Sequence, residues 1–177
     1  MATIYQHVLG DRFELLPLTL RRFLSEERGG RATGRLTVTR PAGYFRGLAA
    51  TALGIPPAGD YDLILDVSPH RAGQRWVRRF GRHTLATTQI DHHGMLVEST
   101  GPSSLGFQLS IKSGALLFHP SRAWVLGIPW PLWLAPSIVA HNWPNEPGGW
   151  RVRVEFRVPL LGLVGRYEGD VMPEVVA

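Results

Sequence analysis

The sequence has no cysteine, a single lysine and no long apolar run. Without cysteine, the chain has no disulfide, no thiolate metal site and no cysteine nucleophile. No segment approaches the roughly 20 uninterrupted apolar residues that a membrane-spanning helix needs. The N-terminus lacks a basic region followed by an apolar stretch, so we predict no secretory signal and a cytoplasmic location.

The signatures of common catalytic sites are also missing. The chain has no Gly-rich phosphate loop, no His-Glu-x-x-His motif, no nucleophile elbow and no clustered carboxylates. His92 and His93 are adjacent in an expected hairpin loop beside Asp91, for which we favour a solvated turn over a metal site. His119 precedes Pro120, and we expect it to end a strand at a barrel rim. We predict neither a metal nor a cofactor.

The length and composition indicate one folded domain spanning residues 1–177. With 177 residues, 44% apolar and 19% charged, the chain is long and apolar enough to bury a sizeable core. Residues 1–57 have helical spacing at 3–9, at 11–28 with an interruption at Pro17, and at 44–53. One alternating stretch at 33–40 predicts a strand in this helical part.

From residue 61 onward the apolar period changes to two, which is typical of strands. The predicted strands cover residues 61–67, 75–80, 84–90, 95–99, 105–112, 115–119, 138–143, 150–158 and 160–171, with turns between them, including one at 145–149. An antiparallel meander of this size, over residues 58–172, must curl, and closure removes its exposed edges. We therefore predict an α+β, mainly β fold: a strongly curved antiparallel meander sheet or barrel of about nine strands, with two or three short N-terminal helices.

The formal net charge of +5 comes almost entirely from arginine. Arg151, Arg153 and Arg157 share one face of a predicted strand and would form a basic stripe with Arg75 and Arg79. Because no stacking aromatics are interleaved with them, we favour a solvated exterior over a nucleic-acid interface. We predict no nucleic-acid partner.

Arg78 is the most informative charge, because it shares a predicted face with Trp76 and Phe80. If that face points inward, the guanidinium needs a counter-ion or an anionic ligand group. The candidate partners are Glu98, Asp66 and a bound carboxylate. The alternative is that Arg78 points outward and stacks on a tryptophan.

Residues 124–136 hold three of the six tryptophans and three of the fourteen prolines, without a charge. The prolines exclude a regular central strand, so the stretch is expected to be two strand ends joined by a Pro-rich corner. Three alternatives stay open for it: a buried corner, the rim of a ligand pocket, or an exposed patch that docks a partner or a membrane surface. The orientation of Trp130 and Trp133 decides between them.

Several motifs together resemble a bacterial family, domain of unknown function 4166. They are Trp76-Val-Arg-Arg-Phe80-Gly81, residues 101–107, Leu126-Gly127-Ile128-Pro129, Pro131-Leu132-Trp133-Leu134-Ala135-Pro136, residues 159–162, Tyr167-Glu168-Gly169, and the opening stretches 5–9, 15–17 and 22–23. The resemblance implies that members occur alone or as a module behind NAD-binding reductases of the saccharopine-dehydrogenase type. It implies no catalytic residue and no substrate, and this chain contains no dinucleotide fingerprint.

Three hypotheses about function follow. The first is a non-catalytic, lipocalin-like module that binds a hydrophobic or amphiphilic small molecule, with an anionic head at Arg78. The second is an accessory module that docks on such a reductase through Trp130 and Trp133, and the third is a small cyclase or isomerase using Arg78 with His119 or Glu98. The predicted ligand-binding residues are Trp76, Arg78, Phe80, Phe107, Leu109, Trp124 and Phe156.

Overall fold

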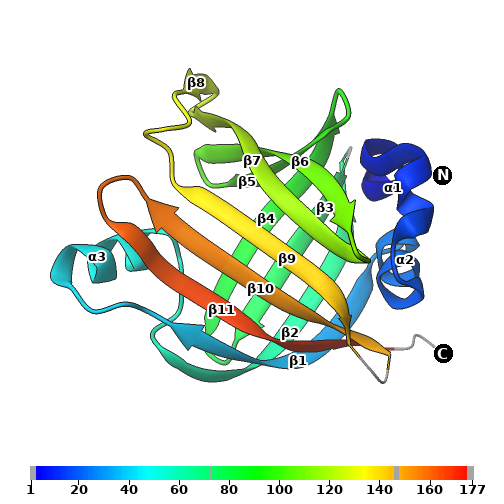
Figure 1. The fold of residues 1–177 in the computed structure, drawn as a ribbon, viewed down its shortest axis with the longest axis horizontal. Helices are drawn as coiled ribbons and strands as arrows, with labels where there is room; N and C mark the ends of the chain where they lie inside the picture. Colours follow the sequence, from blue (N-terminus) through cyan, green and yellow to red (C-terminus); the bar gives the residue numbers. More distant parts are fainter. Residues whose placement is uncertain (1–2, 72, 146–147, 175–177) are drawn as a thin grey trace.

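A computed structural model describes residues 3–71, 73–145 and 148–174, and its dominant feature is an antiparallel β-barrel (Figure 1). The helical elements are α1 (Ile4–Leu9), the 3-10 helix η1 (Gly10–Leu15), α2 (Leu18–Ser25) and α3 (Tyr44–Ala52). The strands are β1 (Gly30–Thr39), β2 (Gly59–His70), β3 (Gly73–Phe80), β4 (His83–His92), β5 (Met95–Thr100), β6 (Ser103–Lys112), β7 (Ala115–Val125), β8 (Ile128–Trp130), β9 (Ser137–Asn145), β10 (Gly149–Val158) and β11 (Gly162–Pro173).

Ten of these strands close the barrel. Neighbours follow the order β6-β5-β4-β3-β2-β1-β11-β10-β9-β7, and β6 pairs with β7 to complete the ring. The first strand meets the last along most of its length, from Ala32 opposite Pro173 to Thr39 opposite Arg166. Closure pairs most of both edges of the meander, and the part left unpaired lies between β7 and β9.

The predicted fold class is confirmed, and the closure that the sequence left open is now decided. The alternation of β10 illustrates the physical basis: Trp150, Val154 and Phe156 are buried, whereas Arg157 is exposed. Residues 146 and 147 of the turn predicted at 145–149 lie outside the described residues.

The prediction that His119 ends a strand was wrong. β7 continues through Pro120 to Val125, and the register against β6 shifts at this point, so that Phe107 lies opposite Pro120 and Gly106 opposite Arg122. Such a bulge accommodates a proline, which lacks the N–H that a regular ladder requires.

The N-terminal helices cover one end of the barrel, at the right in Figure 1. Tyr5 of α1 is almost fully buried, and its hydroxyl donates a 2.7 Å hydrogen bond to Gln89 Oε1 on β4. Phe23 of α2 packs on Trp150, with ring centroids 5.0 Å apart, and on Trp76 at 6.2 Å. We call this end the closed end.

The opposite end carries α3 and the connections β3–β4, β5–β6, β7–β9 and β10–β11 (Figure 1). We call it the mouth. β7 pairs with β9 only over residues 116–118 and 140–142, and its last residues pair with β8 instead. The β7–β9 seam is therefore unpaired toward the mouth, where β8 and the loop after it lie.

Candidate functional site

The barrel encloses a cavity of about 450 Å³, within the size range of small-molecule sites. Most of its lining is apolar and comes from the inward faces of the strands and from α1, α2 and α3. At the mouth it is bordered by Pro102 in the β5–β6 turn, by Trp124 and Val125 of β7, and by Ala135 and Pro136 before β9. The cavity thus reaches the unpaired seam.

A polar cluster lies within this apolar lining. Arg78 of β3 donates from Nη1 to Thr87 Oγ1 at 3.0 Å and from Nη2 to Glu98 Oε1 at 3.3 Å. The Thr87 hydroxyl donates to the same Glu98 oxygen at 2.5 Å. All three residues line the cavity, and the side chains of Arg78 and Glu98 are only 16% and 20% exposed. The cluster is an ion pair that carries no net charge.

The cluster keeps unused hydrogen-bonding capacity. A guanidinium has five N–H donors, of which Thr87 and Glu98 take two. Both bonds to Glu98 reach Oε1, so among the described residues Oε2 keeps its acceptor positions. The guanidinium also lies over the Trp76 ring, 5.4 Å from its centroid, where cation–π attraction holds it. The site therefore presents both donors and an acceptor to whatever occupies the cavity.

Burial and the ion pair set the ionisation of the site. Burial lowers the pKa of Arg78, but the interactions with Glu98, Tyr167 and Tyr5 together outweigh burial, so that the pKa is raised overall and the charge is retained. Burial raises the pKa of Tyr5, and the Glu98 charge adds to this effect. Burial also raises the pKa of Tyr167, another residue of the lining. Both phenols are neutral at ordinary pH.

Six of the seven residues predicted to bind a ligand line this cavity: Trp76, Arg78, Phe80, Phe107, Trp124 and Phe156. Leu109 is buried in the core but does not line it. Arg78 has a feature of each alternative considered for it. It points inward and pairs with Glu98, as the first alternative required, and it also stacks on Trp76, as the second required. Asp66, the other proposed counter-ion, instead pairs with Arg31 and Arg79 outside the cavity.

Sequence reasoning missed Thr87, Gln89, Tyr5 and Tyr167 as lining residues. On β4 the usual alternation is reversed, because Thr87 and Gln89 are buried while Ile90 is 37% exposed. The only indication in the sequence was that polar side chains recur at every second residue of this Thr-rich strand. It does not indicate which face points inward.

The buried-corner alternative for Trp130 and Trp133 was wrong. Their side chains are 45% and 76% exposed, on β8 and in the loop before β9. Ala135, in contrast, is buried and lines the cavity.

The histidines do not gather into a site. The His92 and His93 rings contact each other in the β4–β5 turn at the closed end. His119 is exposed, bonds Ser110 and does not line the cavity, so the proposed pairing of His119 with Arg78 is excluded. In the described parts of the chain, no group of three or more His, Cys, Asp or Glu side chains is arranged to hold a metal ion.

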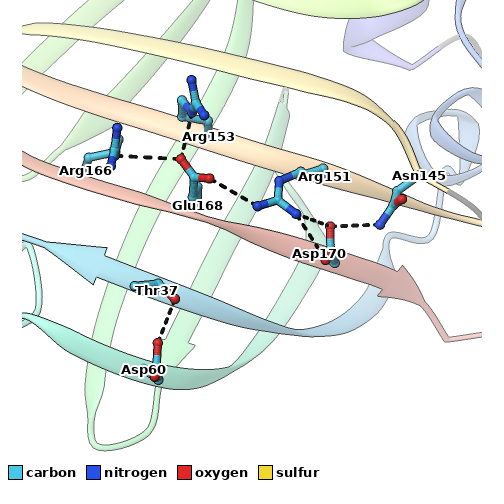
Figure 2. Close-up of polar contacts among 8 residues, drawn as sticks. All are labelled: Thr37, Asp60, Asn145, Arg151, Arg153, Arg166, Glu168 and Asp170. Atoms are coloured by element: carbon cyan, nitrogen blue, oxygen red, sulfur yellow. Dashed lines mark hydrogen bonds and ion pairs between the residues drawn. The ribbon is translucent and has the colours of Figure 1, made fainter.

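The arginines of β10 belong to an outer network of ion pairs (Figure 2). Arg151 donates to Glu168 and Asp170 of β11, and Arg153 donates to Glu168 at 2.8 Å. The hydrogen bond from Arg153, above all, lowers the pKa of Glu168. The neighbours of β10 are β9 and β11, so the expected stripe with Arg75 and Arg79 does not form. Carboxylates largely neutralise this face.

Comparison with known proteins places the chain in a family. The model of the domain of unknown function 4166 matches residues 16–171, and the chain belongs to this family. No curated protein matches the chain. A crystal structure from Nostoc punctiforme, of a DUF3598-family protein of unknown function, is similar in fold, with a TM-score of 0.54 at 14% identity. The match covers 82% of this chain and 47% of that one, so the chain spans about half the length of this relative.

Proposed function

We propose that this protein is a binding module that holds one hydrophobic or amphiphilic small molecule inside its barrel. The observation that carries the proposal is the cavity of about 450 Å³, whose mostly apolar lining contains the hydrogen-bonded cluster of Arg78, Thr87 and Glu98. Ligand sites in proteins commonly combine an apolar lining with a few placed polar groups that fix orientation. A barrel of this size either fills its interior with side chains or holds a ligand.

The polar cluster suits a neutral head group better than an anionic one. The anionic head expected from the sequence required Arg78 to lack a protein counter-ion, but Glu98 supplies the opposite charge 3.3 Å away. A carboxylate head would bring a second negative charge beside Glu98 in a low-dielectric site. A hydroxyl, ester or amide head would instead use the remaining Arg78 donors and Glu98 Oε2.

The proposal is tested by filling the cavity. Ala140 lines it on β9, between Phe118 and Val154 in register. Ala140→Phe should place a ring inside and lower the affinity for a neutral apolar fluorophore such as Nile red by about ten-fold or more. Ala86→Phe is the matched control, since Ala86 is exposed on the outer face of β4.

Native mass spectrometry and solvent extraction of the purified protein provide the second arm. We expect a co-purifying apolar molecule with wild type and with Ala86→Phe, and its loss with Ala140→Phe. If the folded wild-type protein neither binds the fluorophore nor carries an extractable molecule, the barrel is not a ligand-binding module.

A further inference from the structure

Exposed apolar side chains are concentrated at the mouth of the barrel. Ten of the fourteen large hydrophobic side chains that are exposed in the described chain belong to mouth connections. Three come from α3, six from the β7–β9 connection and one, Leu160, from the β10–β11 turn. The most exposed aromatics are Tyr44 and Trp133, at 81% and 76%. We call these ten side chains the apolar rim.

Contacts between the connections hold the rim in place. Arg46 of α3 donates from Nε to the Leu161 carbonyl at 3.0 Å, which ties α3 to the β10–β11 turn. The Leu126 amide donates to the Pro102 carbonyl at 2.7 Å, which joins the β7–β8 and β5–β6 turns. Prolines also stiffen the β7–β9 connection. A fixed apolar surface loses little conformational entropy when it is buried against a partner.

The charged residues in the connections at the mouth are all arginines, whereas the exposed Asp60 and Asp62 lie just beyond them at the mouth end of β2. The mouth connections contain Arg40, Arg46 and Arg82, and no aspartate or glutamate occurs at 40–58, 81–82, 101–102, 126–136 or 159–161. Arg40 and Arg46 bond uncharged oxygens, and no described carboxylate lies within ion-pair distance of any of the three. The helices at the closed end, in contrast, carry both signs, with Asp11 and Glu14 beside Arg12 and Arg21.

We propose that the apolar rim docks on the surface of a bilayer that contains anionic lipids, with the mouth facing the bilayer. Tryptophan and tyrosine favour the interfacial region because their rings are apolar with one polar group, and arginine is attracted to anionic headgroups. The rim lies at the same end of the barrel as Trp124, Val125, Ala135 and Pro136, which line the cavity beside the unpaired β7–β9 seam. A ligand held in the barrel then passes to or from the bilayer without crossing water; this transfer step rests on the proposed binding function.

Vesicle flotation tests the docking directly. We expect the wild-type protein to float with vesicles of phosphatidylcholine and phosphatidylglycerol, and to bind less to phosphatidylcholine alone or at high salt. Trp133→Ala should lower the partition coefficient about ten-fold or more. Arg82→Gln should lower it about five-fold, the factor that corresponds to one arginine near an anionic surface.

Matched controls are available at the closed end. Ile128 at the mouth and Leu15 in η1 are equally exposed, at 65% each, so Ile128→Ala should weaken vesicle binding and Leu15→Ala should not. Arg22→Gln, on the exposed side of α2, is the control for Arg82→Gln. Equal losses from both members of a pair would overturn the assignment of the mouth as the docking surface.

The docking proposal and the ligand-binding proposal can be disproved independently of each other. Nile red binding in the absence of vesicles should be unchanged in Trp133→Ala, whereas Ala140→Phe should lose Nile red binding and keep vesicle binding. A wild-type protein that binds Nile red but never floats with anionic vesicles overturns the docking and leaves the proposed function intact. A rim that instead mediates a dimer in sedimentation experiments, or that binds only a protein, also overturns it.

Discussion

Arg78 and Glu98 form an ion pair, 3.3 Å between Nη2 and Oε1, although their strands β3 and β5 do not pair with each other. Thr87 of the intervening strand β4 completes the link by accepting from Arg78 and donating to Glu98. Three strands thus share one polar cluster inside a barrel whose lining is mostly apolar. We therefore expect the stability of the barrel to depend on Glu98.

We expect Glu98→Gln to lower the free energy of unfolding by about 2–4 kcal/mol, because it leaves the Arg78 charge without a counter-ion in a low-dielectric site. The control is Glu155→Gln, which breaks the exposed pair with Arg157 and should cost less than about 1 kcal/mol. Urea unfolding of both variants measures the difference. Equal small losses would mean that the cavity is hydrated enough to screen Arg78.

The same substitution should change ligand preference. Glu98→Gln gives the cluster a net positive charge, so we expect the affinity for a fluorescent fatty acid to rise relative to that for Nile red by about ten-fold. Fluorescence titrations of wild type and variant measure this ratio. A wild-type protein that already prefers the carboxylate probe would contradict the neutral-head proposal.

The exposed rim should matter little for folding. We expect Trp133→Ala to change the free energy of unfolding by less than about 0.5 kcal/mol, as is usual for an exposed side chain. Phe80→Ala removes a fully buried ring that packs 5.4 Å from Tyr167 and should cost about 3–5 kcal/mol. The urea midpoints of the two variants measure the difference, provided that the dependence of the unfolding free energy on urea concentration is unchanged. A large loss from Trp133→Ala would assign that ring to the core.

Alkaline pH should destabilise the barrel through its buried phenols. Burial raises the pKa of Tyr5 and of Tyr167, so the folded chain keeps protons that the unfolded chain releases near pH 10. Stability is therefore independent of these groups below about pH 10 and falls as pH rises above it, by up to about 1.4 kcal/mol per pH unit for each group. Urea unfolding at several pH values from about 8 to about 11 measures the slope.

Two tyrosine-to-phenylalanine variants show whether Tyr5 causes this fall of stability with pH. Tyr5→Phe should make it shallower, whereas Tyr44→Phe should leave it unchanged because Tyr44 is 81% exposed. An unchanged slope in Tyr5→Phe would contradict the role given to Tyr5.

Two glycines should respond in opposite directions to alanine. A Cβ at Gly169 of β11 would lie 2.0 Å from the Arg35 carbonyl oxygen of β1, so Gly169→Ala must push apart the strands that close the barrel. Gly47 lies within α3, where a Cβ meets no atom within 4 Å, and Gly47→Ala should stabilise by about 0.5–1 kcal/mol. Thermal unfolding of both variants tests this. A stabilising Gly169→Ala would mean that β1 and β11 are more loosely paired.

The strands could be predicted from the sequence, but the pairing of β1 with β11 could not. The alternation in β10 and β2 predicted the strands and their inward residues, because burial of one face imposes a period of two on the sequence. Closure depends on contacts between Leu36 and Gly169, which are far apart in the chain. No local pattern encodes such a pairing.

The candidate site, too, could be predicted from the sequence only in part. Trp76, Arg78 and Phe80 could be assigned to one face from their spacing alone, and Glu98 was among the partners considered for Arg78. Which partner Arg78 takes is decided by the register of β2 to β5: Asp66 lies opposite Val77, on the outer face, whereas Glu98 points inside.

The sequence by itself determined the mainly β meander, the family and the inward set on β3, because these depend on local periodicity and on motifs. Only the tertiary structure decided that the sheet closes, that Thr87 and Gln89 face inward on β4, and that Trp130 and Trp133 are exposed. These properties depend on strand register and on contacts between distant segments. The same long-range geometry places the apolar side chains of three separate connections at one end of the barrel.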